Sequence, residues 1–121
     1  MVYSDFDIDL EAGLEGELLV EELAKGKKTV EVKRDFIVSR TGNLAVEVSF
    51  RDKPSGIRAT KAEWWVWVLD GPLYNKEVIV FVSTDRMKRI TDRIEQERGT
   101  VRGGDGNMSR LVLVPVEEIL K

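Results

Sequence analysis

Two segments with alternating polar and apolar residues constrain the fold of this chain most strongly. Residues 31–35 read EVKRD, and residues 47–49, which follow after eleven intervening residues, read EVS. Because successive side chains of a β-strand point to opposite faces, each segment predicts a strand whose polar residues share one face. Two acids and a lysine, Asp35, Glu47 and Lys33, would then converge from adjacent strands. This arrangement suits a divalent cation held beside a phosphate.

The remaining periodicities predict a compact α/β arrangement. Leucines at every fourth position, Leu10, Leu14 and Leu18, predict a helix over residues 10–25. Ser83 is a suitable N-cap for a second helix that continues to about Glu97. Strands are predicted at residues 29–36, 44–50, 64–69, 77–82 and 111–114, followed by a short terminal helix. This order indicates a single α/β domain over residues 1–121, with one mixed β-sheet flanked by helices.

The residue types that are missing exclude several classes of enzyme. The chain of 121 residues contains neither cysteine nor histidine. Thiolate sites, the commonest zinc ligand and every mechanism built on a histidine base are therefore excluded. An enzyme of this composition depends on carboxylates, lysine, hydroxyl groups and a hard cation such as Mg²⁺ or Mn²⁺. The sequence has no apolar run of membrane-spanning length and no signal peptide, so we expect a cytoplasmic protein without a membrane partner.

An antiparallel pairing of the two polar strands would bring the charged residues together. If the turn is centred on Thr41, Asp35 lies opposite Glu47, and Lys33 lies opposite Ser49. Directly opposed side chains have Cβ atoms roughly 4.5–5.5 Å apart, so the two carboxylates would repel each other without a cation between them. The alternative interpretation of the same pattern is an exposed sheet face with alternating charges.

Four short motifs occur in an order that resembles a known enzyme group. They are GLEGE at residues 13–17, EVKRD at 31–35, TGN at 41–43 followed by Glu47, and SGI at 55–57 followed by Thr60 and Ala62. Together they resemble the PD-(D/E)XK, or restriction-endonuclease-like, nuclease superfamily, and more closely its small phage-type nucleases. The resemblance implies a restriction-endonuclease-like core and a Mg²⁺- or Mn²⁺-dependent endonuclease that hydrolyses DNA phosphodiester bonds in a phage-infected or prophage-bearing bacterial cell.

The resemblance also implies roles for individual residues. Glu17, Asp35 and Glu47 would bind the metal, with the backbone carbonyl of Val48 as a further ligand. Ser49 departs from the superfamily pattern, which expects a lysine there, and Lys33 on the neighbouring strand would supply the missing charge. A second interpretation assigns Glu31 and Lys33 as the acid and lysine of the motif. It requires an acid such as Asp7 or Asp9 on a preceding strand.

A polar loop and three tryptophans complete the candidate features. Ser55 and Gly56 offer backbone N–H groups for a phosphate, and Thr60 and Lys61 flank the expected site, although an ordinary loop would have the same composition. Trp65 and Trp67 are expected in the core, whereas Trp64 points to the other face.

A cut through both strands of a duplex needs two active sites, which favours a homodimer. Two alternatives remain open at this level. One is a catalytically inactive nuclease-fold module that serves in binding or assembly, and the other is an unrelated α+β interaction domain.

Overall fold

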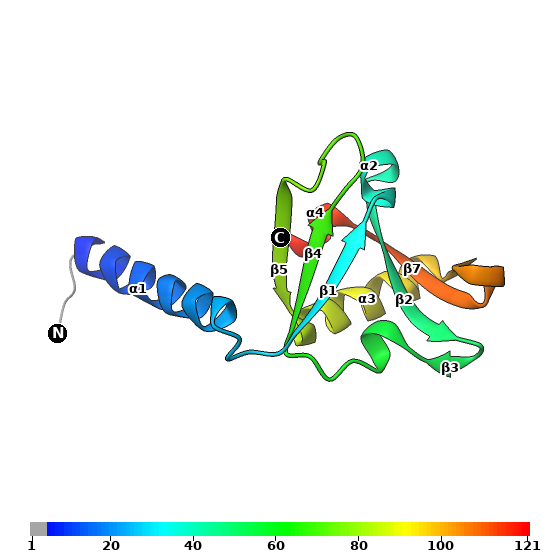
Figure 1. Cartoon of the computed structure of the whole chain (residues 1–121), viewed down its shortest axis with the longest axis horizontal. Helices are drawn as coiled ribbons and strands as arrows, with labels where there is room; N and C mark the ends of the chain where they lie inside the picture. The colour runs from blue at the N-terminus through cyan, green and yellow to red at the C-terminus, as the bar shows by residue number, and fades with distance from the viewer. Residues whose placement is uncertain (1–4) are drawn as a thin grey trace.

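The computed structural model describes residues 5–121, with side chains from residue 13 onward. The chain forms an ordered series of helices (α), 3₁₀ turns (η) and strands (β) (Figure 1). In chain order they are α1 (Asp5–Ala24), β1 (Val30–Asp35), α2 (Ile37–Thr41), β2 (Asn43–Phe50), β3 (Lys53–Pro54), η1 (Gly56–Arg58), β4 (Trp64–Leu69), β5 (Val78–Ser83), α3 (Thr84–Arg98), β6 (Val101–Gly103), η2 (Asp105–Asn107), β7 (Ser109–Pro115) and α4 (Val116–Ile119).

The strands form two sheets, which corrects the expectation of one mixed sheet. The first sheet has the order β1-β4-β5, with β1 parallel to β4 and β5 antiparallel to it. The second has the order β3-β2-β7-β6 and is antiparallel throughout. The expected α/β class and the single small domain are confirmed.

The predicted pairing of β1 with β2 is wrong. Lys33 lies opposite Trp67 of β4, and Glu47 lies opposite Leu111 of β7. The physical reason is the connection, because the expected turn is the short helix α2, which ends at Gly42 in the left-handed conformation (φ 76°). A helical turn separates the two strand directions, so β1 and β2 diverge from α2 instead of forming a hairpin (Figure 1).

The hydrophobic core lies where both sheets meet α3. The helix contacts β4 and β5 of the first sheet and β7 of the second. Trp65 and Trp67 are both buried there, as predicted. Ser83 is confirmed as the N-cap of α3, since its Oγ accepts a hydrogen bond from the backbone N–H of Arg86 at 3.2 Å. The buried apolar side chains are Val38, Leu44, Val46, Val48, Ile57, Trp65, Trp67, Leu69, Val82, Met87, Ile90, Ile94, Val112, Val114 and Ile119.

Helix α1 is longer than predicted and extends away from this core (Figure 1). Within residues 5–121, no helix has the length and apolarity needed to cross a membrane.

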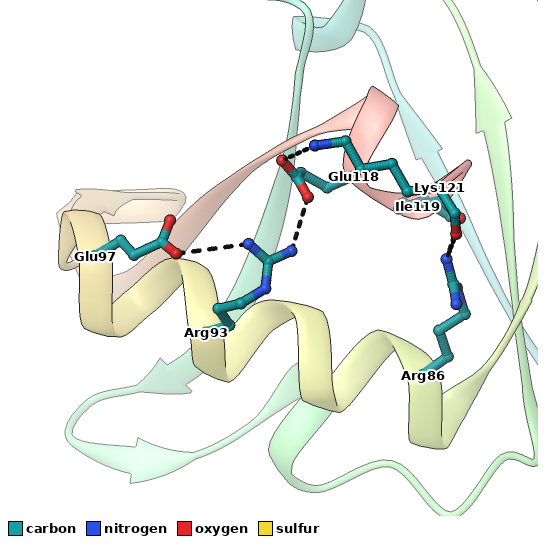
Figure 2. A network of polar contacts seen from close by, with 6 residues as sticks. All are labelled: Arg86, Arg93, Glu97, Glu118, Ile119 and Lys121. Atoms are coloured by element: carbon teal, nitrogen blue, oxygen red, sulfur yellow. Dashed lines mark hydrogen bonds and ion pairs between the residues drawn. The ribbon is translucent and has the colours of Figure 1, made fainter.

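A polar network fastens the C-terminal residues to α3 (Figure 2). Arg93 lies between two acids, 2.7 Å from Glu118 and 3.5 Å from Glu97. Lys121 also contacts Glu118, at 3.0 Å, and Arg86 donates to the backbone carbonyl of Ile119 at 3.2 Å. Hydrogen bonds from Arg93 and then Lys121 hold the pKa of Glu118 below its usual value of 4.5.

The lowered pKa of Glu118 predicts a pH-dependent stabilisation. A carboxylate whose pKa falls on folding stabilises the native state above its unfolded pKa of 4.5, and this stabilisation is lost as the pH falls through the folded pKa. We therefore expect Glu118→Gln to lower the melting temperature slightly at pH 7, and by progressively less as the pH falls below 4.5. The control is Glu117→Gln, an exposed neighbour without an ion pair in the described part of the chain. A Glu118→Gln difference that persists unchanged at pH 3 would contradict the assignment.

Candidate functional site

The carboxylate of Asp35 joins β1, α2 and β2. Its Oδ1 accepts a hydrogen bond from the N–H of Val38 at 3.1 Å, and its Oδ2 accepts one from the N–H of Ala45 at 2.8 Å. The residue is only 6% exposed. These backbone donors fix the orientation of the carboxylate, and the bond to Ala45 holds the end of β1 against β2.

Glu47 is fixed by two serine hydroxyls from other parts of the chain. Ser55 Oγ donates to Oε2 at 2.9 Å, and Ser109 Oγ, from β7, donates to Oε1 at 2.5 Å. The pairing of β2 with β7 shifts register between Glu47 and Ser49, which marks a β-bulge at Val48. Bulges are frequent beside active sites because they redirect side chains, and here the bulge adjoins the half-buried Glu47.

The two carboxylates lie along one short stretch of β2. Asp35 binds the backbone of Ala45, which precedes Glu47 by two residues, a spacing of about 7 Å along a strand. Both accept hydrogen bonds from neutral groups, and neither has an ion-pair partner within the described side chains. Because a carboxylate offers about four lone-pair positions, two hydrogen bonds leave acceptor capacity on each.

Lys33 does not lie where the predicted register placed it. Its ammonium group is 5.5 Å from the centre of the Trp65 ring, within the range of a cation–π interaction. It shares the inner face of β1 with Asp35 and Glu31, and its strand neighbour is β4, so the predicted position opposite Ser49 is wrong. Among the described residues it makes no ion pair.

Glu17 lies on α1, exposed to solvent, and α1 extends away from both sheets (Figure 1). Among the described side chains, no group of three acids is close enough to hold a metal ion. The expected set of three acids around one cation is therefore not assembled within this single copy of the chain. The second interpretation, with Glu31 and Lys33 as the motif residues, is wrong in one respect, because residues 5–24 form a helix and supply no preceding strand. The side chains of Asp7 and Asp9 lie outside the described residues.

The predicted nucleic-acid-binding residues divide into two places. Ser55 and Gly56 lie against Glu47, where Ser55 also donates its backbone N–H to the carbonyl of Val48 at 3.1 Å. Thr60 and Lys61 line a polar hollow of about 370 Å³ beside the start of α3. Lys88 and Asp85 of α3 complete this hollow, so it contains charges of both signs.

One contact at the candidate site was missed by the sequence analysis. Ser109 is only 4% exposed and donates its hydroxyl to Glu47 from a residue 62 positions away. No local pattern indicates this contact, because it depends on the pairing of β7 with β2. The hydrogen bond from the N–H of Val38 to Asp35 did have a signal, since an acid three residues before a helical N–H matches the spacing of an N-terminal cap.

No protein-family model matches this sequence, and no significant match was found among curated proteins or among solved structures.

Proposed function

We propose that this protein is a Mg²⁺- or Mn²⁺-dependent endonuclease that hydrolyses DNA phosphodiester bonds at Asp35 and Glu47. The observation that carries the proposal is the hydrogen bond from Ala45 to Asp35, because it holds one motif carboxylate beside the stretch of β2 that bears the other. The resemblance in sequence supplies the reaction class. Hydrogen bonds orient both carboxylates, and neither has an ion-pair partner among the described side chains, which also supports it.

Two carboxylates are a sufficient protein contribution to a magnesium site. Mg²⁺ keeps several water ligands and is commonly held by one or two carboxylates together with substrate phosphate oxygens. Asp35 and Glu47 would hold the ion, and the carbonyl of Val48, which accepts only one hydrogen bond from Ser55, has a second lone pair to offer. When bound, such an ion polarises the phosphate and lowers the pKa of a bound water. Glu17 would join only if another contact brought α1 to the site.

The remaining residues would bind and orient the substrate. Lys61 is exposed and makes no ion pair within the described side chains, so it can neutralise a phosphate of the DNA backbone. Thr60, Ser55 and Gly56 would add polar contacts. Lys33, on the same face of β1 as Asp35, would turn its ammonium group from Trp65 toward the attacked phosphate and stabilise the charge that develops there.

Cleavage of a DNA panel tests the proposal directly. The protein is titrated with Mg²⁺ and Mn²⁺ in the presence of linear, nicked and branched DNA. We expect metal-dependent products from the wild type and a loss of at least about 100-fold in rate for Asp35→Asn, because the neutral amide no longer attracts a cation. Retained cleavage by Asp35→Asn would remove Asp35 from the mechanism.

A matched control separates catalysis from stability. Asp70 is also a buried acid, at 9% exposure; its backbone N–H donates to the carbonyl of Asp35 at 2.8 Å, but its carboxylate pairs with Arg34 at 2.7 Å and not with the backbone of β2. Asp70→Asn should therefore lower the stability without changing the metal dependence of cleavage. If both variants lose activity in proportion to their melting temperatures, the loss reports unfolding rather than a lost ligand.

A second candidate function is a nuclease-like module that binds nucleic acid or an assembly partner without cutting. Ser49 stands where the superfamily pattern expects lysine, and the described side chains contain no group of three acids that could hold a metal ion. Calorimetry with Mn²⁺ distinguishes the two candidates. If the protein is a nuclease, Mn²⁺ binding to the wild type should give a heat signal that Asp35→Asn reduces. If it is an inactive module, both the wild type and Asp35→Asn should give little heat.

A further inference from the structure

The outer face of the β1-β4-β5 sheet is an exposed apolar surface. Val32, Val66 and Phe81 align across the three strands, and Ile79 adjoins them on β5. Val32 is 58% exposed, Ile79 53% and Phe81 49%, whereas Val66 on the central strand is 6% exposed. The opposite face of this sheet carries Trp65 and Trp67 and is covered by the core. An apolar sheet face left open in this way marks an interaction surface.

Helix α1 carries a stripe of leucine side chains that the rest of its own chain leaves exposed. The side of the helix formed by Leu19, Val20, Leu23 and Ala24 shares an apolar cleft of about 300 Å³ with Trp64 and Phe81. Leu14 and Leu18 lie one turn apart on a different side, because each residue turns the helix by 100°. They are 52% and 58% exposed. Since α1 also extends away from both sheets (Figure 1), the stripe does not rest on its own sheet.

The N-terminal segment that contains α1 and the rest of the chain carry net charges of opposite sign. The first 22 residues contain eight acids and no base, so the remaining residues, with 19 bases and 14 acids, carry a net charge of +5. Arg34, which is paired with Asp70 at 2.7 Å, lies on the outer side of β1, and Lys27 and Lys28 precede the same strand. Glu17 and Glu21 lie along one side of the leucine stripe, and Glu21 is paired with Lys25 at 2.5 Å. An acidic helix with a leucine stripe therefore matches an apolar sheet with basic residues at its margins.

We propose that α1 of one copy packs through Leu14 and Leu18 on the outer sheet face of a second copy, around Val32 and Phe81. The reciprocal contact in the other direction completes a symmetric dimer. This assignment concerns a surface on the opposite side of the sheet from the core and does not depend on catalytic activity. It gives α1 a burial partner for the side that its own chain leaves exposed.

Sedimentation of the full chain tests the exchange of helices. The wild type should shift from 13.8 kDa toward twice that mass as its concentration rises through the micromolar range, roughly 1 to 100 μM. Leu18→Glu and Val32→Glu should each raise the dissociation constant about 100-fold or more, because each places a carboxylate inside an apolar contact. The control Leu120→Glu makes the same change at an exposed leucine (69%) outside both surfaces and should leave the dimer intact.

A mixture of the two variants discriminates between arrangements. In the exchanged dimer, the intact helix of Val32→Glu can still dock on the intact sheet of Leu18→Glu, so the mixture should form heterodimers when neither variant forms homodimers. A dimer made by helices alone would lose association with Leu18→Glu and keep it with Val32→Glu. A monomer at every concentration, with the helix folded on its own sheet, would also overturn the proposal.

Discussion

Replacing Glu47 with glutamine is expected to lower the rate of metal-dependent DNA cleavage about 1,000-fold, equivalent to about 4 kcal/mol of transition-state stabilisation. The substitution Glu47→Gln preserves the size of the side chain and keeps a carbonyl oxygen for one serine hydroxyl. The other hydroxyl can rotate and accept from the new amide, since a serine hydroxyl both donates and accepts. The negative charge is therefore the principal property that is lost.

The measurement is the single-turnover rate of cleavage over a range of Mn²⁺ concentrations, together with the melting temperature. We expect the melting temperature to change by less than about 3 °C, because the half-buried side chain retains its neighbours. Glu77→Gln makes the same chemical change at an exposed position remote from the serines and should cleave at the wild-type rate. Wild-type cleavage by Glu47→Gln would show that the cutting activity does not use this carboxylate.

The locally encoded parts of the fold could be predicted from the sequence. Helix α3 was predicted nearly to the residue because its signals lie within it: a serine cap at residue 83 and apolar positions Met87, Ile90 and Ile94 at helical spacing. The burial of Trp65 and Trp67 followed from their alternation in an apolar run. Each of these features depends on residues that are close in sequence, where periodicity and capping rules apply.

Strand pairing could not be predicted because it depends on distant residues. Val30 of β1 pairs with Trp64 of β4, 34 positions away, and residues 31–35 contain nothing that selects this partner. Residues 40–43, which read RTGN, were predicted as a turn because of their composition. Gly42 within this segment ends a helix equally well, since a left-handed residue is common at helix C-termini.

The residues of the candidate site could likewise be predicted only where they depend on local sequence. Asp35 and Glu47 were selected from their spacing and lie along one stretch of β2, but the bonds that orient Glu47 come from Ser55 and Ser109. The predicted position of Lys33 failed together with the predicted strand register. Local pattern therefore indicated which residues carry charge, whereas long-range pairing determined which of them meet.

Gly56 is the backbone position at which the fold and the site depend most directly on each other. Its φ of +54° is unfavourable for a residue with a side chain. A Cβ atom there would lie 2.3 Å from the carbonyl oxygen of Glu47 and 2.9 Å from its carbonyl carbon. Because these atoms belong to the backbone of β2, they move only if the bulged strand or the loop after β3 also moves.

We therefore expect Gly56→Ala to lower the free energy of unfolding by about 3 kcal/mol, the sum of a strained backbone and a displaced strand. Against a total stability of about 5–15 kcal/mol for a domain of this kind, this is a large loss. Urea denaturation measures it. Because the displaced atoms belong to Glu47, cleavage by the folded fraction should fall as well.

Gly26→Ala is the matched control for this prediction. Gly26 has a similar positive φ of +72°, but a Cβ atom added there would meet no other atom within 4 Å, so the substitution adds backbone strain without a clash. It should cost about 1 kcal/mol and leave cleavage unchanged. The difference between the two variants isolates the close approach of Gly56 to Glu47. Equal losses in stability would show that β2 and the loop separate at little cost, and that Gly56 does not hold the carboxylate in place.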